Sequence, residues 1–142
     1  MTIDDLVDDV IDYNSGKYEK CMVFMVHCMD LISDKLPEVG EQALDVASKF
    51  WTQNMVDSIQ LDNAKIQCWE YLKYYSATTN VKEVRFCAMR AVICLLYTDY
   101  KDEDADETLA FFFKMLELIY GNEAKLVEDL SLTIKNFKAS NI

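Results

Sequence analysis

The sequence predicts an all-α fold: one domain over residues 1–142, a bundle of about seven helices with mostly antiparallel neighbours and a central fifth helix. Three observations indicate this. The chain has only 3 glycines and 1 proline, so turns with positive φ and tight β-hairpins are scarce. Apolar residues make up 51% of the chain, enough for one sizeable core. They recur at helical spacing in seven stretches joined by short polar links, which favour antiparallel neighbours.

The first helix is expected from Ile3 to Tyr13, where apolar and acidic residues separate onto two faces. Thr2, followed three residues later by Asp5, resembles a capping box at its start. We expect Gly16 to prevent this helix from continuing. The polar face, which we call the acidic ridge, consists of Asp4, Asp5, Asp8, Asp9 and Asp12.

The second helix is expected from Lys17 to Lys35. Its apolar face consists of Tyr18, Cys21, Met22, Met25, Cys28, Met29 and Ile32. Pro37 suits the first turn of a third helix and disfavours helical backbone just before it, so a new helix should begin there. We expect that third helix to end near Asn54.

The fourth helix is expected over residues 63–75, with Asp62 as its N-cap. The residues before it, 55–61, have no clear periodicity and are interpreted as a link. Its apolar face is predicted from helical spacing to consist of Ile66, Trp69, Leu72 and Tyr75.

The fifth helix, Val81 to Tyr97, is apolar nearly all round, which is typical of a central helix. Asn80 with Glu83 is interpreted as its capping box. The sixth helix is expected over residues 106–120.

Gly121 should end that sixth helix. The seventh helix is expected from Glu123 to Phe137. Its apolar face should consist of Leu126, Leu130, Ile134 and Phe137.

The net charge is −11, from 25 acidic and 14 basic residues. Nucleic acids and anionic membrane surfaces bind clustered Lys and Arg, so neither is an expected partner, whereas a basic protein would be attracted. The five cysteines form no C-x-x-C pair and lie in apolar stretches, which favours a reducing compartment. The acidic first 14 residues lack the apolar core of a signal peptide. We therefore expect a cytoplasmic protein.

Nearly all of the excess charge lies in two stretches. Residues 1–12 hold five acids and no base, and residues 99–107 hold six acids and Lys101, so each carries −5. The second stretch, which we call the acidic segment, contains Asp99, Asp102, Glu103, Asp104, Asp106 and Glu107. Two hypotheses remain open: a solvated surface without a role, or electrostatic capture of a basic protein through both stretches.

The acidic segment also has two possible local roles. Asp104 as N-cap with Glu107 at the third helical position would start the sixth helix. Asp102, Asp104 and Asp106 match the first three ligand positions of an EF-hand loop. The glycine required at position 6 is instead Glu107, and the glutamate required at position 12 is Phe113, so no metal site is predicted.

For most of the other notable residues, a structural role is favoured over a functional one. His27, the only histidine, should lie on the surface, and the Cys/Met face of the second helix is interpreted as core packing rather than a copper(I) site. Arg85 and Arg90 lie on the most apolar helix, where we expect ion pairs with carboxylates. Tyr71 and Tyr74 are predicted to contact a partner, because Tyr is frequent at interfaces.

No phosphate-binding glycine loop, HExxH or GxSxG pattern occurs in the chain. We therefore predict no catalytic residues and no cofactor. The alternative of a helical metalloenzyme built on clustered carboxylates remains open, because such a site needs no contiguous motif.

The stretches "AKIQCWEYLKYY", "VKEVRFCAMRAVICLLY" and "DETLAFFFKMLELIYG", within residues 64–121, resemble small all-helical bacterial immunity proteins of polymorphic-toxin and contact-dependent growth-inhibition systems. The resemblance implies a non-catalytic protein that binds one cognate toxin domain and covers its active site. Many such toxins are basic nucleases, which an acidic surface would suit. The alternative is an adaptor that holds a partner helix in an apolar groove.

Overall fold

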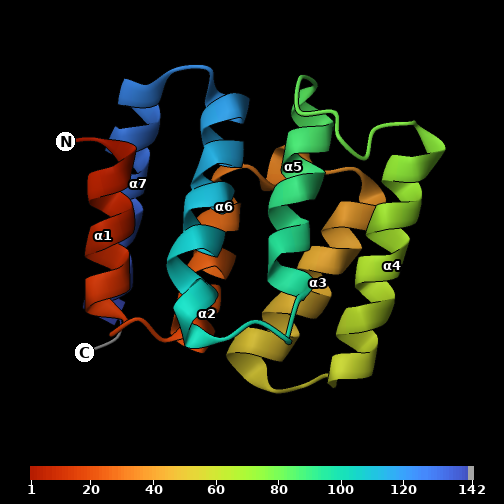
Figure 1. Ribbon diagram of the computed structural model, residues 1–142, viewed down its shortest axis with the longest axis horizontal. Helices are drawn as coiled ribbons and strands as arrows, with labels where there is room; N and C mark the ends of the chain where they lie inside the picture. Colours follow the sequence, from red (N-terminus) through yellow and green to blue (C-terminus); the bar gives the residue numbers. More distant parts are fainter. Residues whose placement is uncertain (141–142) are drawn as a thin grey trace.

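The computed structural model describes residues 1–140, and within that range every regular element is helical. Seven α-helices form a bundle around one continuous apolar core, which confirms the predicted fold class (Figure 1). They are α1 (Ile3–Tyr13), α2 (Tyr18–Cys28), α3 (Glu38–Gln53), α4 (Ser58–Tyr74), α5 (Val84–Ile93), α6 (Ala105–Tyr120) and α7 (Glu123–Ser140). None of these helices is long and apolar enough to cross a bilayer.

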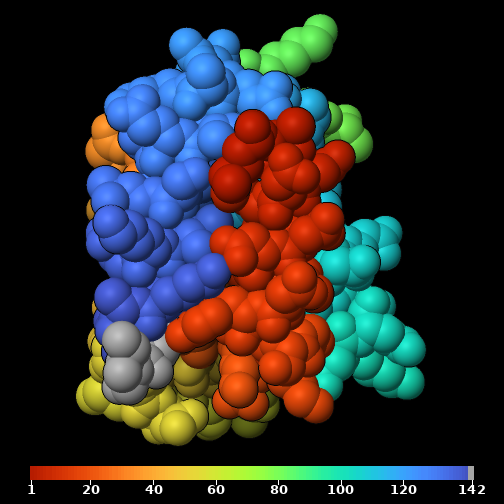
Figure 2. Space-filling view, turned by 90° about the vertical axis from the view of Figure 1, so that its left-hand side faces the viewer, coloured from red at the N-terminus to blue at the C-terminus, as the bar shows by residue number. Residues whose placement is uncertain are grey.

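The helices lie in two layers. In Figure 1, α1, α6 and α5 stand side by side in front, and α7, α2 and α3 stand behind them. Helix α4 covers the edge of the bundle and packs mainly on α3. Consecutive helices run in opposite directions, as predicted, and α5 lies between α6, α3 and α4 as the central helix. Figure 2 shows α1 and α7 side by side, with the residues at the start of α6 projecting beyond α1.

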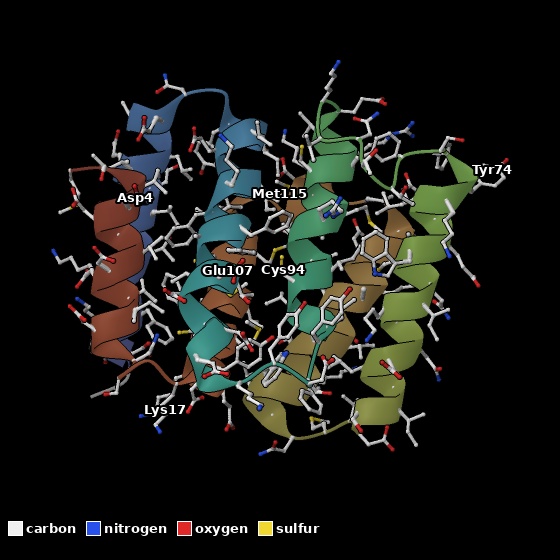
Figure 3. All side chains as sticks on the ribbon, viewed as in Figure 1. Asp4, Lys17, Tyr74, Cys94, Glu107 and Met115 are labelled. Atoms are coloured by element: carbon white, nitrogen blue, oxygen red, sulfur yellow. The ribbon has the colours of Figure 1, made fainter. Side chains whose placement is uncertain are left out.

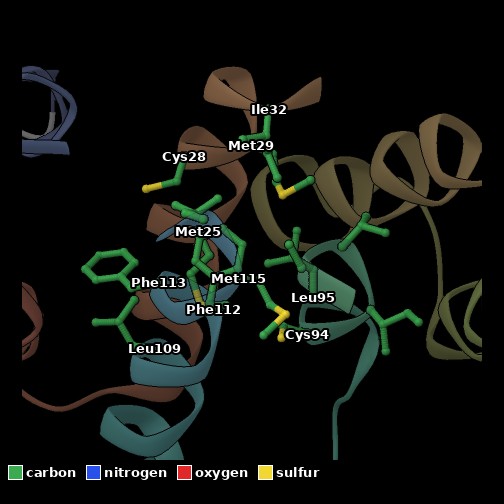
Figure 4. Close-up of a cluster of buried hydrophobic side chains, with 14 of the residues drawn as sticks. Met25, Cys28, Met29, Ile32, Cys94, Leu95, Leu109, Phe112, Phe113 and Met115 are labelled. Atoms are coloured by element: carbon green, nitrogen blue, oxygen red, sulfur yellow. The ribbon is translucent and has the colours of Figure 1, made fainter. Parts of the chain in front are cut away.

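Helix α2 supplies the middle of the core. Every residue of its predicted apolar face is buried, and Phe24 is buried beside them. Figure 4 shows Met25, Cys28 and Met29 together with Phe112 and Phe113 of α6. All five cysteines are free thiols, and burial raises their pKa values, so they act as packing groups in this core.

Helix α2 is shorter than predicted. It ends at Cys28, and two 3₁₀ turns, Met29–Leu31 and Ser33–Lys35, carry the chain to α3. Ile32 leaves the helical region between them, with φ −134° and ψ 6°. Aspartate and serine are weak helix formers, and Pro37 requires extended backbone at the residue before it, so the prediction of one helix to Lys35 was wrong.

Helix α4 begins earlier than predicted. Its N-cap is Asp57, not Asp62: the Asp57 carboxylate accepts from the backbone N–H of Gln60, and the Gln60 side chain accepts from the backbone N–H of Asp57, both at 3.0 Å. Residues 58–61, which were interpreted as part of a link, therefore form its first turn. The buried face consists of Leu61, Ala64, Cys68 and Leu72.

Two residues of the predicted face of α4 are solvent-exposed. Ile66 is 51% exposed and Tyr75 is 43% exposed. The reason is that α4 lies at the edge of the bundle and needs only a narrow stripe of small and apolar residues against α3.

Helix α5 begins three residues later than predicted and gives way to a 3₁₀ turn, Cys94–Leu96. Asn80 does accept from the backbone N–H of Glu83, at 3.4 Å, but Glu83 itself occupies the N-cap position. The prediction for the end of α6 is confirmed: Gly121 takes the left-handed conformation, with φ 66°.

Candidate functional site

The acidic ridge covers the outer face of α1, as predicted. Its Thr2–Asp5 capping box is present: the Asp5 carboxylate accepts from the Thr2 backbone N–H at 2.8 Å, which lowers the pKa of Asp5. Asp9 pairs with the Lys138 ammonium of α7 at 2.8 Å. The remaining carboxylates are exposed on this face: Asp4, Asp8 and Asp12. The apolar side of the helix, buried at Leu6 and Val10, anchors the ridge on the core.

The acidic segment is connected to the core through Asp102. Its carboxylate accepts from the backbone N–H of Tyr18 at 2.9 Å and from the Lys17 ammonium at 3.4 Å. Tyr18 is the first residue of α2. Lys17, at the N-cap position, makes no side-chain hydrogen bond that caps the helix. Asp102 therefore supplies the missing N-cap from a distant part of the chain. The Tyr18 N–H is the main cause that lowers the pKa of Asp102.

Asp104 and Glu107 occupy the N-cap and third helical positions of α6, as predicted, but the Asp104 side chain caps no backbone N–H of that helix. The backbone of Asp104, with φ −91° and ψ −7°, ends a 3₁₀ turn (Asp102–Asp104) and lacks the extended conformation of a typical N-cap. Its carboxylate accepts instead from the backbone N–H of Lys101 at 2.8 Å. The Asp106 carboxylate accepts from the Glu107 N–H, also at 2.8 Å. The aspartates of the EF-hand-like pattern thus bond to separate backbone groups, and within residues 1–140 no three acidic, histidine or cysteine side chains converge on a metal position.

A pocket of about 360 Å³ lies beside the acidic segment. Helix α5 forms one wall, α4 and α6 form two others, and the chain between α5 and α6 closes the end. Figure 3 labels Cys94 and Glu107 on two of these walls, on the face toward the viewer. The lining consists of Trp69, Arg90, Ile93, Cys94, Tyr97, Tyr100, Asp104, Glu107, Thr108 and Phe111. The pocket therefore joins two carboxylates of the acidic segment to aromatic side chains.

The aromatic part of the pocket is held in place by contacts to the core. Tyr97 and Tyr100 stack with ring centroids 5.2 Å apart and planes inclined by 10°. The Tyr97 hydroxyl lies 3.3 Å from the Trp69 indole N–H, which donates to it. Beneath them, the buried Tyr18 donates its hydroxyl to the Tyr97 carbonyl at 3.1 Å and meets the Tyr100 ring edge-on at 5.9 Å. Burial raises the pKa of Tyr100, with nearby Tyr97 and Asp99 adding to the rise. Tyr18 thus supports both this wall and the backbone that Asp102 caps.

The two arginines behave differently. Arg85 lies 3.8 Å from Glu83, as expected for an ion pair, and also stacks over Tyr75. Arg90 makes no ion pair with any described carboxylate, so that expectation was wrong for this residue. Its guanidinium donates to the Thr78 carbonyl at 2.8 Å.

The same Arg90 guanidinium lies over two pocket rings, Trp69 at 5.3 Å and Phe111 at 5.4 Å from the ring centroids. Aromatic faces and a carbonyl satisfy this half-buried cation without a carboxylate. As a result, it neutralises neither acidic side chain of the pocket by direct contact.

The remaining predicted residues lie away from the pocket. Tyr74 is 81% exposed, but Figure 3 places it at the outer edge of the molecule, on α4, whereas Glu107 lies nearer the middle, on α6. Tyr71 is half-buried, because α4 turns it toward α5, and it packs against Tyr75 and Phe86. His27 is exposed on the surface, as predicted, with its ring 5.3 Å from that of Phe137.

Sequence reasoning missed the aromatic wall of the pocket. The available signal was the pair Tyr97 and Tyr100, which flanks Asp99 at the start of the acidic segment.

Searches among protein families, curated proteins and solved structures found no match to this chain.

Proposed function

We propose that this protein binds a positively charged protein through the acidic segment and the adjoining pocket, and that it acts as an immunity protein covering the active site of a cognate basic toxin domain. The observation that carries the proposal is that unpaired carboxylates lie beside an aromatic pocket on one face of the molecule. The resemblance over residues 64–121 supports the immunity role.

The exposed carboxylates of the segment are suited to steering a partner. Asp99, Glu103 and Asp106 are exposed, and none of them forms an ion pair within the described chain. Clustered charge of one sign accelerates encounter with a partner of opposite sign, and the acceleration weakens with salt. Asp102 has a different task, because it caps α2 and holds the segment against the core.

Aromatic residues are suited to forming the centre of such an interface. Interface anchors are enriched in Trp, Tyr and Arg, lying in pockets and surrounded by a polar rim. Tyr100 and Phe111 are partly exposed here although they line the pocket. Their burial by a partner would add apolar contact to the electrostatic attraction.

The experiment uses the basic C-terminal domain of any large protein encoded directly upstream as the partner, with association measured by stopped-flow at several salt concentrations. We expect the triple variant Asp99→Asn, Glu103→Gln, Asp106→Asn to associate about tenfold more slowly at low salt, with a flatter salt dependence. The variant should also lose protection in a growth assay.

The acidic ridge offers a control of equal charge change: Asp4→Asn, Asp8→Asn, Asp12→Asn. Its association rate should stay much closer to that of the unchanged protein, because these side chains stand on α1, away from the pocket lining. If both variants slowed association equally, the slowing would come from the change in net charge and not from the position of the acidic segment. An unchanged rate for the segment variant would end the proposal.

A further inference from the structure

We propose that the pocket between α4, α5 and α6 binds an arginine side chain of the partner. This inference rests on the proposed function, since it identifies which group of a basic protein would enter the pocket. Three properties of the pocket favour this occupant: its charge, the geometry of its aromatic walls and its size.

The charge of the pocket favours a cation. Asp104 and Glu107 both line it, and neither carboxylate lies within ion-pair distance of a basic side chain in the described part of the chain. Asp104 has a single neutral donor, the Lys101 backbone N–H, and a carboxylate can accept several hydrogen bonds. Arg90 is the one basic residue of the lining, and it is already held by the Thr78 carbonyl and two rings. Two carboxylates beside a cavity therefore remain available to an incoming donor.

The geometry of the walls favours arginine over lysine. The rings of Tyr97 and Tyr100 stack nearly parallel in the pocket lining. The Lys65 ammonium already lies 4.4 Å from the Tyr97 ring centroid, so the partly exposed Tyr100 is the ring on which an incoming guanidinium can stack. A guanidinium is planar, stacks on aromatic faces and is more weakly hydrated than an ammonium. It also presents several N–H donors in a fixed fork, which suits two carboxylates better than a point charge does. The volume of about 360 Å³ lies within the usual range for ligand pockets and admits one long side chain.

The tryptophans provide a direct measurement. Trp69 lines the pocket, whereas the Trp51 indole N–H donates to the Leu95 carbonyl at 2.7 Å and does not line it. In a two-dimensional NMR titration with Nα-acetyl-arginine amide, we expect the Trp69 indole signal to shift with added ligand. The Trp51 signal serves as an internal reference and should stay in place.

Matched ligands separate charge from shape. Nα-acetyl-citrulline amide has nearly the shape of the arginine compound but no charge, and we expect it to bind about three- to fivefold more weakly, as for one partly exposed ion pair. Nα-acetyl-lysine amide should also bind more weakly than the arginine compound. Equal affinity for citrulline would overturn the assignment to a cation, and equal affinity for lysine would overturn the assignment to arginine.

Two variants of the same chemistry locate the effect. Glu107→Gln should weaken arginine-amide binding about three- to fivefold, whereas Glu41→Gln, at an exposed residue of α3 outside the lining, should leave it within twofold. Equal weakening by both would show a diffuse charge effect and would overturn the pocket assignment. The result is separable from the proposed function, because the stopped-flow experiment with the three segment carboxylates does not alter any residue of the pocket lining.

Discussion

The acidic ridge and the acidic segment carry the same net charge of −5 over similar lengths, yet the fold uses them differently. The ridge lies along one helix, and its bonds are local or reach only to α7, through Thr2 and Lys138. The segment runs from the chain after α5 into the first turn of α6, caps α2 through Asp102, and borders an aromatic pocket. Equal charge therefore does not give equal roles: the tertiary surroundings of each stretch decide which carboxylates are structural and which are free.

This difference has a physical cause. On a helix, side chains at i and i+4 project to the same side, so Asp4, Asp8 and Asp12 stand in a row and face water together. In the segment, a 3₁₀ turn and a loop turn successive side chains in different directions. One carboxylate consequently reaches the α2 terminus, two border the pocket, and the others remain in solvent.

The largest expected effect comes from removing the aromatic support of the segment. Tyr18 is only 5% exposed and contacts both Trp51 and Tyr100 edge-on. Tyr18→Ala should lower the free energy of unfolding by about 3–5 kcal/mol, as for other buried aromatics, and should perturb the Trp69 indole signal. Urea unfolding measures the loss of stability, and NMR detects the change in the Trp69 indole signal.

Helix α1, which carries the ridge, supplies the control for this prediction. Tyr13, at the end of α1, is 40% exposed, so Tyr13→Ala should cost only about 1 kcal/mol and leave the pocket signals in place. Equal losses from the two variants would contradict the claim that a buried tyrosine supports the segment but not the ridge.

A smaller effect is expected at the cap that joins the segment to α2. Asp102→Ala removes the acceptor for the Tyr18 N–H and should lower the melting temperature at pH 7, more than Glu103→Ala does. The folded-state pKa of Asp102 is lowered, so its contribution is complete above the ordinary pKa of Asp. It is lost as the pH falls through the lowered value.

The difference between Asp102→Ala and the unchanged protein should therefore be constant near neutral pH and shrink below about pH 4. Thermal melts followed by circular dichroism over pH 2–7 measure it. A difference that grew on acidification would contradict the role of the carboxylate as an N-cap.

Much of the fold could be predicted because its patterns are local. The opposed faces of α1, the Cys/Met face of α2 and the all-round apolar α5 follow from helical periodicity alone. The errors arose where tertiary position decided the outcome. Ile66 is exposed because α4 sits at an edge, a fact that periodicity does not contain.

The candidate site was predictable only in its charge. The acidic residues of the segment could be named, but their division of labour depends on contacts across about 80 residues of chain, such as that between Asp102 and Tyr18. The Asp104 cap was assigned to the wrong backbone group because a 3₁₀ turn before α6 has no clear sequence signal. The pocket itself required Trp69 of α4 to meet the region from Arg90 to Phe111, a contact that no local pattern specifies.

The smallest expected effect lies on the ridge and has the opposite sign. Asp8 stands four residues from both Asp4 and Asp12, so its charge is repelled by two neighbours on the same face. Asp8→Asn should raise the free energy of unfolding by about 0.2–0.5 kcal/mol at low salt. In 1 M salt the gain should vanish, because screening then acts over only about 3 Å. Urea unfolding at both salt concentrations measures this, with Glu103→Gln as the segment counterpart. A loss of stability in Asp8→Asn would mean that the ridge, too, makes contacts that depend on its charge, and the contrast between the two regions would fail.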